Sequence, residues 1–266
     1  MTLDTDETTA QRGTNGVQSL SRAFAILEVM ADAGGIIGLS ELAERADLPL
    51  ATIHRLVRTF VDLGYVRQEP TRQYSLGPRL TRLADASSKR IATWARPTMN
   101  AAVAQLGESV NLAVLDGDEI VYVAQVQPSK NFMRMFTEVG RRTLPHATAV
   151  GKAILSQRSD HEVTDLLDRT GMARYTDHTL TTPREFLAEL AEVRDRGYAI
   201  DEGEQERGVR CVAVVVPGAP QPMALSMSGP LTRMDDAVVE RAATVLHDAA
   251  AEIGTELNRT QAPRDL

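Results

Sequence analysis

The chain has 266 residues, of which 43% are hydrophobic, and it carries a formal net charge of −7 at pH 7. This length suits two domains with packed cores, and the acidic balance argues against a protein that coats nucleic acid nonspecifically. No apolar run approaches the roughly 18 residues of a membrane span, so we expect no membrane partner. The first 16 residues lack an apolar stretch, which predicts a disordered tail rather than a secretory signal. The single cysteine excludes an internal disulfide and fits a cytoplasmic protein.

Residues 39–64 predict a short helix, a tight turn and a second helix. Ser40 is the expected N-cap of the first helix and a candidate DNA-binding residue. Asp47-Leu48-Pro49 forms the turn, because proline disfavours helix at the residue before it. In the second helix one apolar stripe contains Ile53, Leu56, Val57 and Phe60. The opposite face carries Ala51, Thr52, His54, Arg55 and Arg58. This pattern is typical of a helix that rests on a small core and offers its other face to a DNA groove.

The flanking segments complete a winged helix-turn-helix over residues 17–78. Upstream, Ser19 is the expected cap of a helix that runs to about Ala33. Downstream, Gly64 ends the recognition helix, and residues 65–68 and 72–76 flank a turn as a β-hairpin. Arg72 at the hairpin tip is placed to contact phosphate or the minor groove. The alternative interpretation is an ordinary helical hairpin with a solvated basic face.

The predicted DNA-binding domain is nearly neutral. Residues 17–78 contain six Arg and no Lys against seven acidic residues. The arginines Arg55, Arg58, Arg67 and Arg72 lie in the recognition helix and wing, whereas most acids precede them. We therefore expect weak binding by a monomer, and a dimer that places two heads on a partial inverted repeat of operator DNA.

The rest of the chain predicts a linker helix and a second, α+β domain. Residues 79–96 form the linker helix, with dimer contacts or a simple surface helix as the two interpretations. Residues 97–257 form the domain with an antiparallel sheet, and residues 258–266 form a C-terminal tail. The expected elements of the domain over 97–257 are a helix from Pro97 to Gly107, a hairpin over 110–126, a helix over 183–196, strands 211–216 and 223–228, and a helix from about Asp235.

Three polar clusters in the second domain are hard to explain by packing alone. Small residues at 148–151 bring a loop into a helix, and free N–H groups at such a point favour carboxylates or phosphates. Asp201 lies in an acidic loop before the strand that begins with Cys211. Ser226 and Ser228 share one face of a strand. The alternatives are close helix packing by the small residues, a small buried cysteine and serines on a solvated edge.

Taken together, these motifs resemble the IclR family of bacterial transcription regulators over about residues 17–257. The resemblance rests on Ser21-Arg22-Ala23, His54-Arg55-Leu56, the segments 148–153 and 208–213, and Ser226-Met227-Ser228-Gly229-Pro230. It implies a winged-helix head, a linker helix, a GAF-like effector domain, and homodimers or dimers of dimers on operator DNA. In relatives that sense small 2-oxo acids, the ligand touches positions that match Ala149, Val150, Asp201, Cys211, Ser226 and Ser228. Ala149 replaces the glycine of those relatives, and Val150 is bulkier than their residue.

The leading hypothesis is therefore a ligand-controlled transcription factor, a repressor of a catabolic operon. It would be released by a small oxo or hydroxy acid such as glyoxylate, or by a ureide such as allantoin, and no cofactor is expected. One alternative is an enzyme with Cys211 as nucleophile, His146 as base and Asp201 as orienting group, although the acidic surroundings disfavour a thiolate. Another is an architectural DNA-binding protein without a ligand. The five histidines show no metal-ligand spacing.

Overall fold

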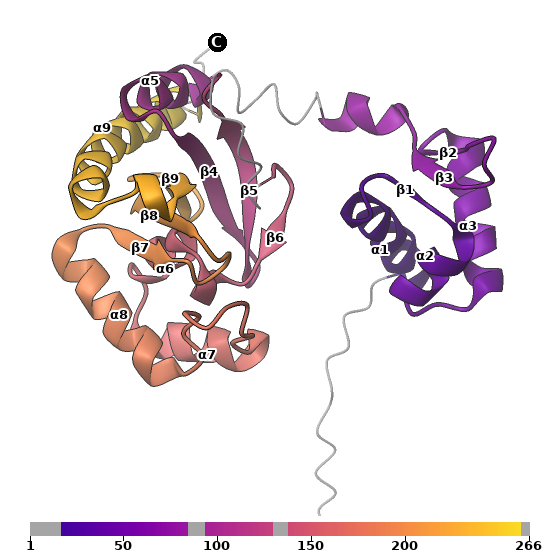
Figure 1. Cartoon of the computed structure of the whole chain (residues 1–266), viewed down its shortest axis with the longest axis horizontal. Helices are drawn as coiled ribbons and strands as arrows, with labels where there is room; N and C mark the ends of the chain where they lie inside the picture. Colours follow the sequence, from indigo (N-terminus) through magenta and orange to yellow (C-terminus); the bar gives the residue numbers. More distant parts are fainter. Residues whose placement is uncertain (1–16, 85–93, 130–137, 262–266) are drawn as a thin grey trace, which may run out of the picture. The chain divides into compact units, whose positions relative to one another are not determined.

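The computed structural model describes residues 17–84, 94–129 and 138–261 (Figure 1). The chain divides into two compact units, residues 1–86 and 87–266, which we describe separately. The predicted tail at 1–16 and residues 85–93 of the predicted linker helix lie outside the described residues, whereas residues 79–84 are helical. Within the described ranges, no helix has the length and apolar character needed to cross a membrane.

The first unit is a winged helix-turn-helix, as predicted. Residues Ile26, Met30, Leu42, Ile53 and Val57, each at most 1% exposed, form its core. The three strands follow the order β1-β3-β2 and pair antiparallel. Its elements are α1 (Gln18–Asp32), β1 (Ile36–Ile37), α2 (Leu39–Arg45), α3 (Leu50–Leu63), β2 (Val66–Gln68) and β3 (Tyr74–Leu76).

The two predicted serine caps are wrong. The N-cap of α1 is Val17 and that of α2 is Gly38, and neither side chain caps its helix. Ser19 and Ser40 instead lie inside the first turns. For α2 the reason is tertiary: β1 pairs with β3 up to Ile37, which holds the chain extended through Gly38 and lets the helix begin two residues earlier.

The tip of the wing also differs slightly from the prediction. Residues 69–73 form the turn, closed by the bond from the Glu69 N–H to the Gln73 carbonyl (2.8 Å). Arg72 therefore belongs to the turn rather than to the second strand, and it adopts a left-handed conformation with φ 65°. This leaves the Arg72 side chain exposed at the hairpin tip, as expected.

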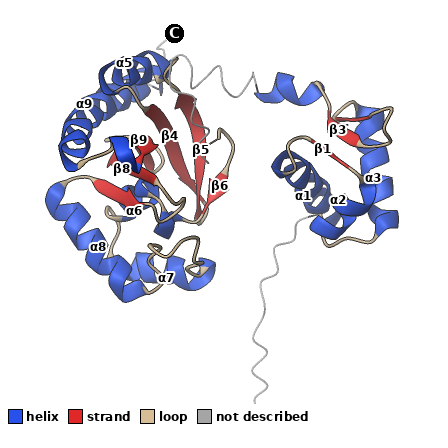
Figure 2. Cartoon of the chain, viewed as in Figure 1, coloured by secondary structure: helices blue, strands red, loops and turns tan. Residues whose placement is uncertain are grey.

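The second unit is built on a six-stranded antiparallel sheet with the order β6-β5-β4-β9-β8-β7. Helices α5 and α9 cover one face, and α6, α7 and α8 lie on the other (Figure 2). The strands are β4 (Ser109–Asp116), β5 (Glu119–Val126), β6 (Arg142–Thr143), β7 (Ala199–Glu202), β8 (Val209–Val215) and β9 (Met223–Pro230). The helices are α5 (Arg96–Leu106), α6 (Ala149–Leu155), α7 (Asp160–Thr170), α8 (Pro183–Arg196) and α9 (Asp236–Gln261). Two short 3-10 helices are η1 (Pro145–Ala147) and η2 (Leu231–Arg233).

The period-two pattern of β9 divides its side chains between the two layers. Met223, Leu225 and Met227 pack into the core under α5 and α9. Ser226 and Ser228 therefore point to the other face, as the alternation predicts. This places two hydroxyl groups beneath α6 rather than in water, because both serines are 2% exposed.

One domain boundary is wrong. Helix α9 continues to Gln261, so the predicted tail at 258–266 begins too early. Leu257 still packs into the core at 4% exposure, and the first helix-breaking residue after it is Pro263. At the other end α5 begins at Arg96, one residue before the predicted start.

Candidate functional site

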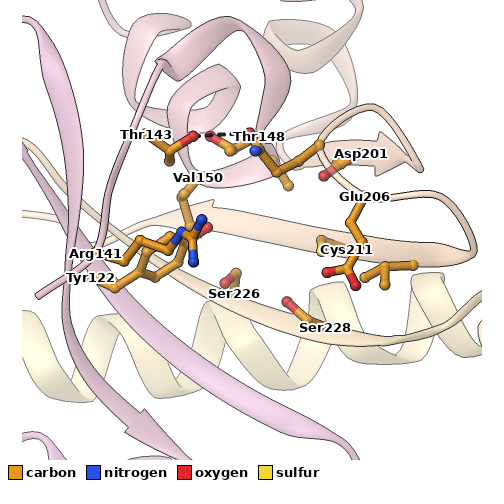
Figure 3. Close-up of a pocket in the computed structure, with 13 residues that line it drawn as sticks. Tyr122, Arg141, Thr143, Thr148, Val150, Asp201, Glu206, Cys211, Ser226 and Ser228 are labelled. Atoms are coloured by element: carbon orange, nitrogen blue, oxygen red, sulfur yellow. Dashed lines mark hydrogen bonds between the residues drawn. The ribbon is translucent and has the colours of Figure 1, made fainter. Parts of the chain in front are cut away.

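A small cavity lies between strands β5, β7, β8 and β9 of the sheet and the start of α6 (Figure 3). The six predicted effector residues all line it: Ala149, Val150, Asp201, Cys211, Ser226 and Ser228. The cavity volume of about 20 Å³ leaves room for about one water molecule. A metabolite can therefore bind only if side chains around the cavity move. The structure brings the six residues together, while their contact with a ligand stays a prediction.

The first turn of α6 forms one wall of this cavity. Thr148 is the N-cap, and its hydroxyl oxygen accepts the N–H of Gly151 at 3.1 Å. The N–H groups of Ala149 and Val150 belong to the first turn, where the helix itself supplies no acceptor. Gly151 permits this arrangement, because a Cβ there would lie 2.1 Å from the carbonyl oxygen of Pro145 in η1.

The serines are held by a buried amide that the sequence analysis missed. Asn111 on β4 is 0% exposed, and its Nδ2 donates to Ser228 Oγ at 3.1 Å. Its Oδ1 in turn accepts from Gln125 Nε2 at 2.9 Å. Because Ser228 accepts from Asn111, its own hydroxyl proton can be donated elsewhere. The signal in the sequence was an asparagine in the middle of an apolar strand, because a buried asparagine side chain needs hydrogen-bond partners.

Cys211 is not set up as a nucleophile. Burial raises the pKa of its thiol, the charge of Asp201 raises it further, and the hydrogen bond with Ser228 only partly opposes this. A thiol held protonated is unreactive. His146 Nε2 lies 2.9 Å from the carbonyl oxygen of Ala173, and His146 is not among the described residues that line the cavity. The geometry therefore gives the enzyme hypothesis no support.

Asp201 belongs to a buried charged cluster with Lys152 and Glu204. It is 3% exposed, and its Oδ1 accepts the N–H of Glu204 at 2.6 Å. Burial raises the pKa of Asp201 to about 7, with a further rise from Glu204 and an opposing effect from Lys152. Lys152 Nζ donates to the Ile200 carbonyl at 2.9 Å and pairs with Glu204 Oε1. Burial also raises the pKa of Glu204 despite this pairing.

Of this cluster only Asp201 was predicted from the sequence, whereas Lys152, Glu204 and part of the cavity lining were not. In the sequence, the signal for Lys152 was a lysine within a run of small and apolar residues. In the structure all seven residues of α6 are buried. The lining residues that were missed are Tyr122, Arg141, Thr143, Thr148, Gln205, Glu206 and Val209. Burial raises the pKa of Tyr122, so its phenol stays neutral and able to donate. Thr143 Oγ1 lies 2.9 Å from Gln205 Oε1 and donates to it.

The second candidate site is the outward face of α3. Ala51, His54, Arg55 and Arg58 are exposed there, whereas Thr52 is half-buried. Ser40 on α2 and Arg72 in the wing are exposed as well. The structure thus presents the predicted DNA-contacting residues at the surface, and the contacts themselves stay predictions. Over the described part of the chain, no group of three or more His, Cys, Asp or Glu is arranged to hold a metal ion.

Comparisons with known proteins identify relatives of both units. A model of the IclR helix-turn-helix domain matches residues 19–70, and one of the C-terminal domain of the bacterial transcriptional regulator IclR matches residues 84–255. The acetate operon repressor of Salmonella typhimurium is 38% identical over 248 residues, covering 90% of each sequence. The IclR transcriptional regulator from Alicyclobacillus acidocaldarius is similar with a TM-score of 0.80 and 27% identity, over 91% of this chain and 99% of that one. An IclR homologue from Microbacterium hydrocarbonoxydans, solved in complex with 4-hydroxybenzoate, has a TM-score of 0.75 and 26% identity over 91% of this chain and 99% of that one.

Proposed function

Because the chain belongs to the IclR family of transcriptional regulators, we propose that it is a repressor released from its operator by a small polar effector. The observation that carries the proposal is the combination, in one chain, of an exposed arginine face on α3 with a cavity in the second unit into which several polar side chains converge. The acetate operon repressor among its relatives supports repression of a catabolic operon. The 4-hydroxybenzoate complex of a homologue supports a small-molecule effector.

On the DNA side, Arg55 and Arg58 contact the operator from α3, with His54 and Thr52 near base edges. The near-neutral head requires two copies for useful affinity. The apolar surface of α1 supports a homodimer, because Leu20 is 56% exposed and Phe24 is 58% exposed. Exposed large apolar side chains that lie one helical turn apart are suited to pairing with a second copy. The operator is then a partial inverted repeat with half-sites about one DNA turn apart or a multiple of it. A dimer of dimers would pair two such units.

On the effector side, the cavity offers both donors and an acceptor. The N–H groups of Ala149 and Val150 and the hydroxyls of Ser226 and Ser228 donate to oxygens of the effector. Asp201 accepts from a hydroxyl or N–H of the effector, so a hydroxy acid, hydrated aldehyde or ureide fits better than a plain acid. An enclosed site with a few convergent polar groups is typical of small-ligand sites. Binding of the effector changes operator affinity only to the extent that the effector binds one conformation of the protein more tightly than the other.

The test begins with duplexes selected by the full-length protein from a random pool. Fluorescence anisotropy then measures operator release by glyoxylate, small hydroxy acids and allantoin. Ser226→Ala and Ser228→Ala should weaken the response by roughly 5- to 150-fold, because each removes one buried hydrogen bond worth about 1–3 kcal/mol. Effector-free operator affinity should stay within about twofold of the parent, since these changes lie outside the DNA-binding unit.

Ser156→Ala is the matched control, because Ser156 is a buried serine of the same unit whose hydroxyl donates to the Ala153 carbonyl at 2.8 Å. It should respond to effector like the parent protein. Equal responses from all three serine variants would place the effector outside this cavity. Failure of the selection to enrich any sequence would contradict the operator-binding proposal itself.

A further inference from the structure

Helix α3 begins with an apolar side chain that the core of the first unit does not use. Leu50 is the first residue of α3, and it is 53% exposed. Leu48, two residues earlier in the turn, packs against the core. Pro49 lies between the two leucines in an extended conformation, with φ −56° and ψ 137°. The chain therefore buries one leucine of this turn and leaves the other at the surface.

The position of Leu50 is more informative than its exposure alone, because single exposed apolar side chains are common on protein surfaces. Figure 1 shows α1 and α3 on different sides of the unit. Leu50 is thus separate from the apolar surface of α1 that we assign to the homodimer. Among the described residues of this unit, the other exposed large apolar side chains lie on α1, in β1, at the end of α3 and after the wing: Val17, Leu20, Phe24, Ile36, Leu63 and Leu83.

Leu50 adjoins the face of α3 that we propose to contact the operator. Residues four apart in a helix lie one above the other, so Leu50, His54 and Arg58 form one row. His54 and Arg58 are exposed, and so is Ala51 beside Leu50. In helix-turn-helix proteins the N-terminal residues of the second helix contact the base edges in the major groove. In this chain the first side chain at that place is aliphatic.

An aliphatic side chain can favour one feature of the major groove. The nitrogen and oxygen atoms of the base edges need hydrogen-bond partners, and a leucine side chain offers none. The C5-methyl group of thymine is the apolar group that the bases present in this groove. Contact between leucine and this methyl group removes two apolar surfaces from water. A polar base edge opposite Leu50 would lose its water without gaining a hydrogen bond.

We propose that Leu50 is a specificity-determining residue that contacts the methyl group of one thymine in each operator half-site. This contact depends on the identity of the base and involves no charge, unlike the contacts proposed for Arg55 and Arg58. The inference rests on the proposed function, because it assumes that α3 enters the major groove of the operator.

The test removes single methyl groups from operator duplexes selected by the full-length protein. Deoxyuridine, which differs from thymidine only by the missing methyl group, replaces each thymidine in turn at matching positions of both half-sites. Fluorescence anisotropy gives the dissociation constants. One pair of substitutions should weaken binding roughly 15-fold, because each half-site loses one buried methyl group worth about fourfold.

Leu50→Ala should bind the unmodified duplex more weakly and should no longer respond to that pair of substitutions. The dependence of its affinity on salt concentration should equal that of the parent, because no phosphate contact is lost. Leu50→Met, which keeps an apolar side chain, should retain part of the preference for the methyl group. A new selection with Leu50→Gln should abolish the preference for thymine at this position and leave the rest of the operator unchanged.

Leu63→Ala is the matched control. Leu63 is the last residue of α3 and is 47% exposed, about 20 Å from Leu50 along the helix axis. This variant should keep the affinity of the parent and its dependence on the methyl group. Melting temperatures without DNA establish that each variant is folded, and light scattering establishes its oligomeric state.

Four results would overturn the inference. In the parent, binding could be indifferent to every methyl group of the operator, or the same dependence could persist in Leu50→Ala. Leu50→Ala could weaken binding to selected and unselected duplexes equally, or it could change the oligomeric state, which would assign Leu50 to a protein interface. The proposed function is judged separately, because selective operator binding without any dependence on a methyl group would leave it intact and refute the role of Leu50.

Discussion

Replacing Asp201 with asparagine should stabilise the effector unit at alkaline pH. In the folded protein the pKa of Asp201 is about 7, against an ordinary value of 3.8. The stability that this group contributes is fully present below pH 3.8 and is lost as the pH rises through about 7. At about 1.4 kcal/mol per pH unit, the difference between the two pKa values corresponds to a loss of roughly 4 kcal/mol above pH 7. Asparagine keeps an oxygen that can accept the N–H of Glu204 and carries no charge to desolvate.

The assay is urea denaturation between pH 5 and pH 8, followed by the fluorescence of Trp94. Trp94 is the single tryptophan, and it packs against the core under α5 and α9, so its signal reports the effector unit. The gain in unfolding free energy for Asp201→Asn should approach about 4 kcal/mol at pH 8 and shrink toward pH 5. Asp195→Asn, an exposed change on α8, is the control and should follow the parent protein at every pH.

The same dependence of unfolding free energy on pH in Asp201→Asn and in the parent would refute the assignment of this pH dependence to Asp201. Burial raises the pKa of Glu204 as well, so some loss of stability with rising pH should remain in the variant. A variant less stable than the parent at pH 8 would show that the carboxylate is paired more strongly than its surroundings indicate.

Three further predictions concern both units. Lys152→Met should lower the unfolding free energy by about 3–5 kcal/mol in the same urea assay, because the Glu204 carboxylate stays buried without its ammonium partner; an unchanged midpoint would contradict this. Gly151→Ala should abolish operator release by effector, since its Cβ would collide with η1, and anisotropy should show operator affinity retained; a normal response would contradict the close approach. The double variant Arg55→Ala, Arg58→Ala should bind selected operator duplexes more weakly. The dependence of its affinity on salt concentration should fall by an amount that corresponds to the loss of up to about two phosphate contacts. Unchanged affinity and salt dependence would exclude α3 as the DNA-contacting helix.

Local patterns were sufficient to predict the secondary structure that rests on periodicity and turn chemistry. The apolar stripe of α3, the left-handed Gly64 at its end and the alternation of β9 each depend on residues close together in the chain. The predicted N-caps Ser19 and Ser40 were wrong. For α2 the reason is that the pairing of β1 with β3, which joins segments distant in the sequence, decides where the helix begins.

The sequence by itself determined which residues face inward on each element, and so placed Asp201, Cys211, Ser226 and Ser228 among the candidates for one site. Only the tertiary structure decided what surrounds them. Asn111 reaches Ser228, and Lys152 reaches Glu204, across 117 and 52 residues of sequence. Arg141 enters the cavity because β6 pairs with β5, which no local pattern specifies. The physical reason is that burial and pairing of polar groups depend on contacts between distant strands and helices, whereas periodicity records only the neighbours of each residue along the chain.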